Sequence, residues 1–113
     1  MGGNLKTFIT GAAAIDPKIS RGFRRWGFLV LQGSGLTECS PLVTGNRDFS
    51  YRDGSAGLAI PGVEIKIDKP DRKGIGEILV KGNSVMAGYY NNPVETNKVL
   101  ADGWFRTGDL GRI

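Results

Sequence analysis

Hydrophobic positions change their spacing partway along the chain. In the first part, apolar residues gather in a short stretch at residues 5–10 and in an unbroken Phe-Leu-Val-Leu run at residues 28–31. Unbroken apolar runs are typical of strands that are covered on both faces, as in parallel sheets packed against helices. The segment between the two stretches has helical spacing. The first part therefore predicts a strand–helix–strand unit with parallel strands.

The intervening segment carries signals for both ends of a helix. Asp16 is suited to cap it, Pro17 to occupy its first turn, and Gly27 to end it. One face is apolar, which predicts packing against the sheet, and the other is basic. The apolar face holds Ile19, Phe23 and Trp26, and the basic face holds Lys18, Arg21, Arg24 and Arg25.

Beyond about residue 45, apolar and polar residues alternate with a period of two. Residues 63–68 and 77–81 alternate on either side of a Pro-Asp-Arg-Lys-Gly turn, which predicts a half-exposed antiparallel hairpin. A short helix is predicted over residues 92–99, and an Asp-Gly turn precedes a strand at residues 104–106. We therefore predict an α/β portion at residues 1–45 and a β-rich portion at residues 46–113, joined by the polar stretch 44–54.

Composition narrows the possible chemistry of this chain of 113 residues. Glycine accounts for 18 of them, which predicts many turns or a backbone that approaches a ligand closely. With no histidine, a His-centred triad, a zinc site with His ligands and a His general base are all excluded. The single cysteine excludes an internal disulfide. No apolar run could span a bilayer and no signal pattern opens the chain, so we expect a cytoplasmic protein without a transmembrane segment.

The first candidate site directly follows the unbroken apolar run. Residues 32–38 read Gln-Gly-Ser-Gly-Leu-Thr-Glu, and ligands of α/β folds bind where parallel strands end. The glycines let backbone N–H groups approach a phosphate, while Thr37 and Glu38 offer oxygen ligands that suit Mg²⁺. A Walker lysine is missing, and Glu38 stands where a dinucleotide fingerprint has its third glycine. Two interpretations stay open: a nucleotide site, and a glycine turn with a solvated Glu38.

The second candidate is Asp109, and the third is the basic helix face. Asp109 stands on a glycine turn after a predicted strand, where a carboxylate can accept hydrogen bonds from both hydroxyls of a ribose. A simple turn-forming aspartate is the alternative. The net charge of +4 and the basic helix face permit nucleic-acid binding, although a solvated face explains the same pattern.

Four segments, taken in order, resemble consecutive motifs of the adenylate-forming enzymes, and most closely those of bacterial long-chain fatty acid CoA ligases. The resemblance covers the chain from Gly11 onward. It implies a remnant of the large N-terminal adenylation domain, with a βαβ portion followed by an antiparallel, distorted-barrel subdomain. The segments are QGSGLTECSP (32–41), GLAIPGVEIKI (57–67), GEILVKGNSVMAGYYNNPVET (76–96) and GWFRTGDLG (103–111).

The resemblance also implies a reaction and a role for each matched residue. Such ligases use ATP and Mg²⁺ to convert a fatty acid to an acyl-adenylate, and then transfer the acyl group to coenzyme A. Thr37 would contact phosphate, Glu38 would hold Mg²⁺, and Asp109 would bind the ribose. The family usually has an aromatic residue at the position of Ser34. Gly11, Ala12 and Ala13 would border the adenine, and Gly33, Ser34 and Gly35 would lie between the adenine and the acyl pocket.

Parts of the family's machinery have no counterpart in this sequence. The 113 residues include no Ser/Thr/Gly-rich phosphate loop with a lysine before Gly11, and they end at Ile113, where the resemblance implies that the hinge and the lysine-bearing C-terminal domain would begin. We therefore expect a fragment that does not form acyl-CoA alone, and that self-associates through surfaces its neighbours would cover. The alternatives are a small, non-catalytic β-rich binding module and a nucleic-acid binder that uses the basic helix face.

Overall fold

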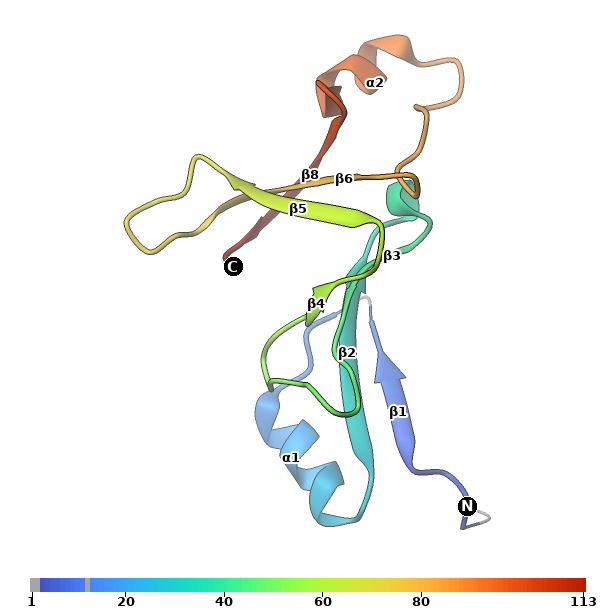
Figure 1. Cartoon of the computed structure of the whole chain (residues 1–113), viewed down its shortest axis with the longest axis vertical. Coiled ribbons are helices and arrows are strands. Elements are labelled where there is room, and N and C mark those ends of the chain that lie inside the picture. The colour runs from blue at the N-terminus through green and yellow to red at the C-terminus, as the bar shows by residue number, and fades with distance from the viewer. Residues whose placement is uncertain (1–2, 12) are drawn as a thin grey trace. The chain divides into compact units, whose positions relative to one another are not determined.

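In the computed structural model, which describes residues 3–11 and 13–113, the chain forms two units (Figure 1). The first unit comprises the residues up to Gly35 together with Leu42–Ile60, and the second comprises Leu36–Pro41 together with Pro61–Ile113. Each unit has a four-stranded sheet of its own. The boundary predicted from the sequence, between an α/β portion at residues 1–45 and a β-rich portion at residues 46–113, stays a prediction.

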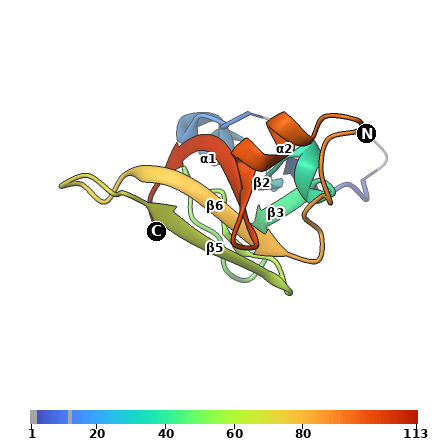
Figure 2. The ribbon, with the colours of Figure 1, turned by 90° about the horizontal axis from the view of Figure 1, so that it is seen from above.

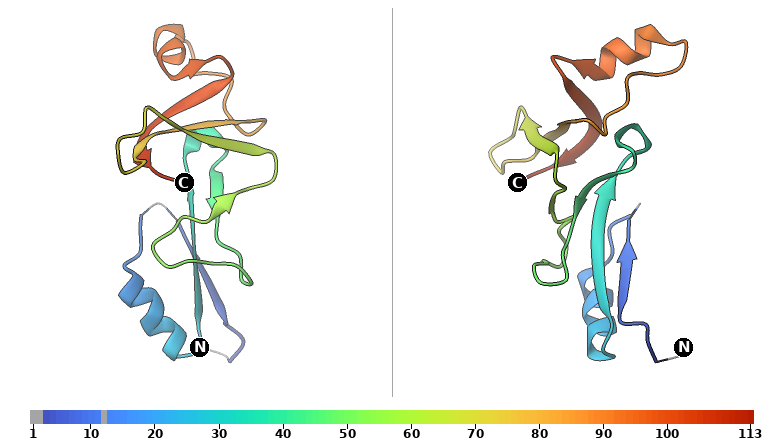
Figure 3. Two further views of the ribbon diagram at one scale, coloured as in Figure 1. Left: turned by 60° about the vertical axis from the view of Figure 1, so that its left-hand side comes forward. Right: turned by 45° about the vertical axis from the view of Figure 1, so that its right-hand side comes forward.

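The first unit begins with the predicted strand–helix–strand motif. Strand β1 (Thr7–Thr10) leads into helix α1 (Pro17–Arg25), which returns the chain to strand β2 (Leu29–Gly35). β1 and β2 run parallel, with Thr7 opposite Leu29 and Thr10 opposite Gln32, and α1 lies alongside β2 (Figure 3). The predicted βαβ arrangement of this part of the chain is confirmed.

Strand β2 is longer than its apolar run predicted. It continues through Gly35 because its second half pairs antiparallel with β3 (Leu42–Gly45), which in turn pairs with β4 (Leu58–Ala59). The interpretation of residues 33–35 as a turn is therefore wrong. Backbone hydrogen bonds extend a strand without apolar side chains, so the pattern of side chains could not reveal this half.

The ends of α1 are confirmed, whereas its apolar face is only partly covered, because Phe23 packs inward and two of its members are exposed. Asp16 caps the helix by accepting a hydrogen bond from the backbone N–H of Lys18 at 2.7 Å. Gly27 follows the helix with φ of +84°, a conformation that favours glycine. Trp26 is 77% exposed and Ile19 is 52% exposed, which supports the predicted self-association without testing it.

Phe23 packs helix α1 against the sheet of the first unit. Its ring packs edge-on against Phe8 in β1 at 5.6 Å between centroids and against Phe28 at 6.5 Å. Phe8 and Phe28 are in turn 5.5 Å apart. Edge-to-face packing of this kind stabilises a small core beyond the area it buries.

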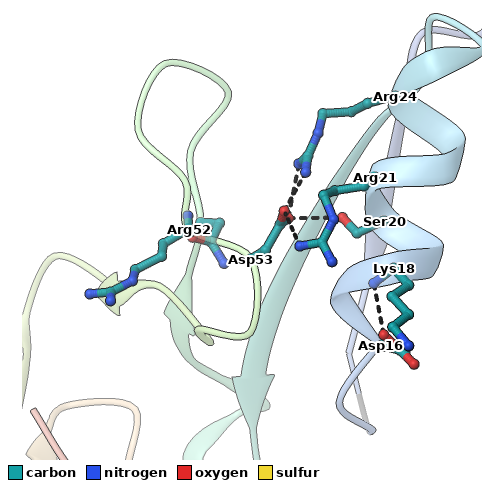
Figure 4. A network of polar contacts seen from close by, with 8 residues as sticks. Asp16, Lys18, Ser20, Arg21, Arg24, Arg52 and Asp53 are labelled. Carbon is teal, nitrogen blue, oxygen red and sulfur yellow. Dashed lines mark hydrogen bonds and ion pairs between the residues drawn. The ribbon is translucent and has the colours of Figure 1, made fainter.

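The polar side of α1 is tied to the loop before β4 by the carboxylate of Asp53 (Figure 4). Both guanidinium nitrogens of Arg24 donate to Asp53, as does the buried hydroxyl of Ser20 at 3.1 Å, and Arg21 lies 3.9 Å away. Hydrogen bonds, chiefly from Arg24, hold the pKa of Asp53 below its usual value. Arg24 also stacks over the ring of Tyr51 at 5.1 Å.

Substituting Asp53→Asn is expected to lower the free energy of unfolding by about 1–2 kcal/mol at pH 7, because a bidentate charged hydrogen bond is lost. Because the folded-state pKa of Asp53 is lowered, its contribution is present above the unfolded-state pKa and is lost as pH falls through the folded-state pKa. The difference between wild type and variant should therefore shrink below about pH 4 in urea titrations. Asp48→Asn is the control, since the Asp48 carboxylate binds only the neighbouring Phe49 N–H within the described chain. A difference that is independent of pH would contradict the prediction.

The second unit contains the predicted hairpin. Strands β5 (Val63–Asp68) and β6 (Gly76–Gly82) pair antiparallel and lie side by side in Figure 2. Strand β8 (Trp104–Gly111) pairs antiparallel with the other edge of β6. The short β7 (Leu100–Ala101) completes the order β5-β6-β8-β7. The hairpin prediction is confirmed, and the last strand extends five residues beyond the predicted end at residue 106.

The two faces of this sheet differ as the alternation predicted. Ile65, Val80 and Phe105 stand opposite one another on one face, where Val80 is fully buried and Phe105 is 2% exposed. On the other face, the Lys66 ammonium lies 4.0 Å from the centroid of the Trp104 ring. The first face is the core of the unit, and the second is polar apart from Trp104 and Leu79. Leu79 pairs with Lys66 and Arg106 on this second face and is only 5% exposed, so it departs from the predicted alternation.

Two local features of the second unit also follow their sequence signals. Helix α2 (Pro93–Val99) is capped by the Asn92 side chain, which accepts from the N–H of Glu95 at 3.2 Å. Asp102 and Gly103, with φ of +53° and +76°, form the turn between β7 and β8. Both the predicted helix and the predicted turn are confirmed.

Candidate functional site

Thr37 and Glu38 lie on a single turn of 3₁₀-helix, η1 (Thr37–Cys39), in the second unit. Cys39 is fully buried and fixes the turn, while Thr37 is exposed and Glu38 is half-buried. Burial, with a smaller effect from the Glu38 charge, raises the pKa of the Cys39 thiol. The turn thus holds an uncharged anchor beneath a hydroxyl and a carboxylate that solvent can reach.

The loop that follows β6 binds Glu38 at two points. The backbone N–H of Met86 donates to the Glu38 carbonyl at 2.7 Å, and the Tyr89 hydroxyl donates to carboxylate Oε1 at 3.1 Å. The hydrogen bond to Glu38 is the main reason that the pKa of the Tyr89 hydroxyl is raised. Tyr89 is therefore a neutral donor to a charged acceptor.

The donor set around Glu38 fits a magnesium ion that is shared with a substrate. Within residues 3–11 and 13–113, no cluster of three or more His, Cys, Asp or Glu side chains could hold a metal. Mg²⁺ usually keeps several waters and takes one or two carboxylates together with substrate phosphates, so a dedicated protein cage is not needed. One Glu38 carboxylate with a hydroxyl neighbour at Thr37 meets that requirement.

Asp109 lies in a bulge of β8, not at the end of a strand as predicted. Leu79 pairs with Arg106 and Glu77 pairs with Leu110, so the three residues 107–109 face the single residue Ile78. The Thr107 hydroxyl fixes the bulge, since it donates to the Ile78 carbonyl at 2.8 Å and accepts from the Asp109 N–H at 3.0 Å. The Asp109 side chain is exposed.

The Glu38 and Asp109 carboxylates lie near opposite ends of the same strand, β6. Glu38 binds the loop that follows the end of this strand, and Asp109 stands across from Ile78 near its beginning. Ile78 and Gly82 are separated by roughly 14 Å at about 3.4 Å per residue of strand. That Glu38 and Asp109 converge on one AMP-shaped hollow stays a prediction.

Within the first unit, the ends of the two parallel strands bring Gly11 and Gly33 together. Thr10 pairs with Gln32, and a Cβ placed on Gly11 would lie 3.9 Å from the Gly33 carbonyl oxygen. Gly33 is buried, and a Cβ there would lie 2.9 Å from the Thr44 carbonyl oxygen in β3. Only a glycine permits β3 to approach this closely.

The other predicted nucleotide contacts of the first unit are exposed where the structure describes them. Ser34 and Gly35 are both exposed at the end of β2. Ala13 is exposed, and its N–H donates to the Gly11 carbonyl at 2.8 Å. Ala12 lies outside the described residues. The roles of these residues toward a nucleotide stay predictions.

Two residues that contact the predicted site residues or fix their backbone could not be assigned from the sequence. Tyr89 belongs to the matched segment GYYNN, and Thr107 to the matched segment RTGD, yet neither was given a role. Tyr89 binds Glu38 across 51 residues of sequence, and Thr107 binds Ile78 across 29 residues. No local sequence pattern encodes contacts at such separations. Their place inside matched motifs was the available signal.

The basic face of α1 is partly neutralised in the structure. Arg24 is bound bidentately by Asp53, and Arg21 faces the same carboxylate. These contacts reduce the charge available to a nucleic acid. The hollow along α1, lined by Ile19, Phe23 and Trp26, includes none of the predicted site residues.

Neither helix in the described part of the chain has the length and apolar content needed to cross a membrane.

Comparisons with known proteins agree on one family. A family profile described as "AMP-binding enzyme" matches residues 1–90. A long-chain-fatty-acid–CoA ligase of Yersinia pestis is 45% identical over 90 residues, which cover 74% of this chain and 16% of that protein. The ligase FadD15 of Mycobacterium bovis is 33% identical over 113 residues, which cover 100% of this chain and 18% of that protein. ATP-bound MatB from Rhodopseudomonas palustris matches with a TM-score of 0.86 at 36% identity, over 95% of this chain and 23% of that chain. The chain spans less than a fifth of the length of these two curated relatives.

Proposed function

Because the chain belongs to the AMP-binding enzyme family, we propose that it carries part of the nucleotide site of a ligase that joins a long-chain fatty acid to coenzyme A. Curated relatives at 33–45% identity are named as such ligases. One structural observation carries the proposal. The second unit holds Thr37 and Glu38 on a fixed turn and Asp109 on a fixed bulge, each with side-chain oxygens that solvent can reach.

The reaction has two steps. A fatty acid carboxylate oxygen attacks the α-phosphorus of ATP, and the bond to the departing pyrophosphate breaks to leave an acyl-adenylate. The sulfur of coenzyme A then attacks the acyl carbonyl carbon, the bond to AMP breaks, and the thiol proton passes to solvent. Both steps need the AMP moiety to stay in place while its partners change.

Each residue of the second unit has one task in this scheme. The Thr37 hydroxyl donates to a phosphate oxygen, and the Asp109 carboxylate accepts from the two ribose hydroxyls. Glu38 supplies a carboxylate oxygen to Mg²⁺. When bound, that ion neutralises the charge of the phosphate oxygens. Contacts of Gly11, Ala12, Ala13 and Gly33–Gly35 with the rest of the substrates are part of the same proposal, and rest on the resemblance.

Titration of the ¹⁵N-labelled chain with AMP and Mg²⁺ tests the proposal. We expect amide shifts at Thr37, Glu38 and Asp109, and a loss of affinity of about tenfold or more in Asp109→Ala, because two charge-assisted hydrogen bonds are removed. An AMP analogue that lacks both ribose hydroxyls is the control. Wild type should bind it as weakly as Asp109→Ala binds AMP.

Two results would count against the proposal. One is a spectrum in which AMP leaves residues 37, 38 and 109 unchanged. The other is a set of shifts confined to α1, with oligonucleotide binding that weakens steeply as salt is raised, which would favour the nucleic-acid alternative.

A further inference from the structure

We propose that Tyr89 is a positioning residue for the Glu38 carboxylate, holding Oε1 so that Oε2 is the oxygen offered to the magnesium ion of the nucleotide. The assignment rests on the proposed function of Glu38. Tyr89 itself touches neither metal nor nucleotide in this scheme.

The backbone of Glu38 is fixed, but its side chain needs a partner. The turn η1 and the Met86 N–H hold the Glu38 main chain, and the carboxylate lies beyond three further rotatable bonds. The Tyr89 hydroxyl, 51 residues away in sequence, is its hydrogen-bond donor at 3.1 Å. A carboxylate held at one oxygen loses less freedom when the other oxygen binds a cation.

Tyr89 can do this because its own backbone is held by the first turn of α2. The Tyr89 N–H donates to Thr96 Oγ1 at 2.9 Å, and that hydroxyl donates to the Asn92 carbonyl at 2.8 Å. Gly88 permits the close approach, since a Cβ there would lie 2.8 Å from Thr96 Cγ2 and the residue has φ of +151°. The chain of contacts therefore runs from the helix cap through Thr96 and Tyr89 to Glu38.

The chemistry of the donor suits a metal ligand. A lysine or arginine in this place would form an ion pair and compete with the cation for the charge of Glu38. A phenol orients the carboxylate without cancelling that charge. Tyr90 provides a contrast, because it is 93% exposed and no hydrogen bond in the described chain uses its hydroxyl.

Binding of Mn²⁺, used as a paramagnetic substitute for Mg²⁺, tests the assignment in the ¹⁵N-labelled chain with AMP held at a saturating concentration. Line broadening at Glu38 measures metal affinity, and a separate AMP titration without metal measures the ribose contact at Asp109. We expect Tyr89→Phe to raise the dissociation constant for Mn²⁺ about tenfold. This is the smallest effect usual for side chains that orient a metal ligand, and we expect it because the Tyr89 side chain is partly exposed. Tyr90→Phe should leave it unchanged, and Glu38→Gln should abolish the broadening at residue 38.

The outcomes separate this inference from the function on which it rests. Metal binding in wild type that Tyr89→Phe leaves unchanged or tightens overturns the role of Tyr89 while the proposed site stands. Equal losses in metal and AMP affinity would mean that Tyr89 only stabilises the fold, and would also overturn it. An absence of AMP shifts and of broadening at Glu38 in wild type overturns the proposed function and this assignment together.

Discussion

Substituting Gly57→Ala should unfold the first unit. Gly57 lies just before β4 with φ of +88°, where an L-residue costs about 1–2 kcal/mol. Its new Cβ would also lie 2.1 Å from the Gly45 carbonyl carbon and 2.2 Å from the Asn46 nitrogen. Both are backbone atoms, so no side chain can rotate away, and β3 and β4 would have to separate. We expect a loss of more than about 4 kcal/mol, which is comparable to the whole stability of a unit of this size.

Gly54→Ala is the matched control for this prediction. Gly54 lies in the same loop with φ of +76°, yet its Cβ would meet only the Pro17 side chain at an ordinary 3.5 Å. Its cost should be the backbone strain alone, about 1–2 kcal/mol. Urea unfolding followed by circular dichroism and by amide spectra of β1–β4 measures both variants. Similar losses in the two would show that the backbone contact at Gly57 is not decisive.

The elements that sequence analysis predicted are those with local signals. The caps of α1 and α2, the alternation in β5 and β6, and the Asp-Gly turn before β8 each depend on neighbouring residues. Strands β3 and β4 were missed, because their four and two residues are defined by pairing with β2 and with each other. The exposure of Trp26 was missed for a related reason, since helical spacing shows a common face and not what covers it.

The candidate site could be predicted as a set of residues but not as a geometry. The motif order pointed to Thr37, Glu38 and Asp109, and the structure places all three in one unit. The bulge that holds Asp109 comes from a register shift between β6 and β8, and the Tyr89 contact comes from a loop 51 residues away from Glu38. Both arise from tertiary pairing, which a single sequence does not record.

The second large effect is expected from Gly76→Ala, at the start of β6. Gly76 is buried, and a Cβ there would lie 2.2 Å from the Asp68 carbonyl oxygen and 3.1 Å from the Cα of Pro70. The hairpin between β5 and β6 would have to open to accept it. We expect a loss of about 3 kcal/mol or more in the second unit.

Gly111, the residue paired with Gly76 across the ladder, is the control. A Cβ on Gly111 would meet only the Ile78 side chain, at 2.7 Å from Cδ1, and a rotamer change can relieve that contact for about 1 kcal/mol. Urea unfolding followed by Trp104 fluorescence in a Trp26→Phe background reports on the second unit alone, because the chain has two tryptophans. Equal losses in Gly76→Ala and Gly111→Ala would contradict the prediction.

The Gly76 variant should also affect the candidate site, because the pairing of β6 with β8 from Gly76 onward contains the bulge at residues 107–109. We expect Gly76→Ala to shift the Asp109 amide signal and to weaken AMP binding, whereas Gly111→Ala should leave the amide position and the AMP affinity mostly unchanged.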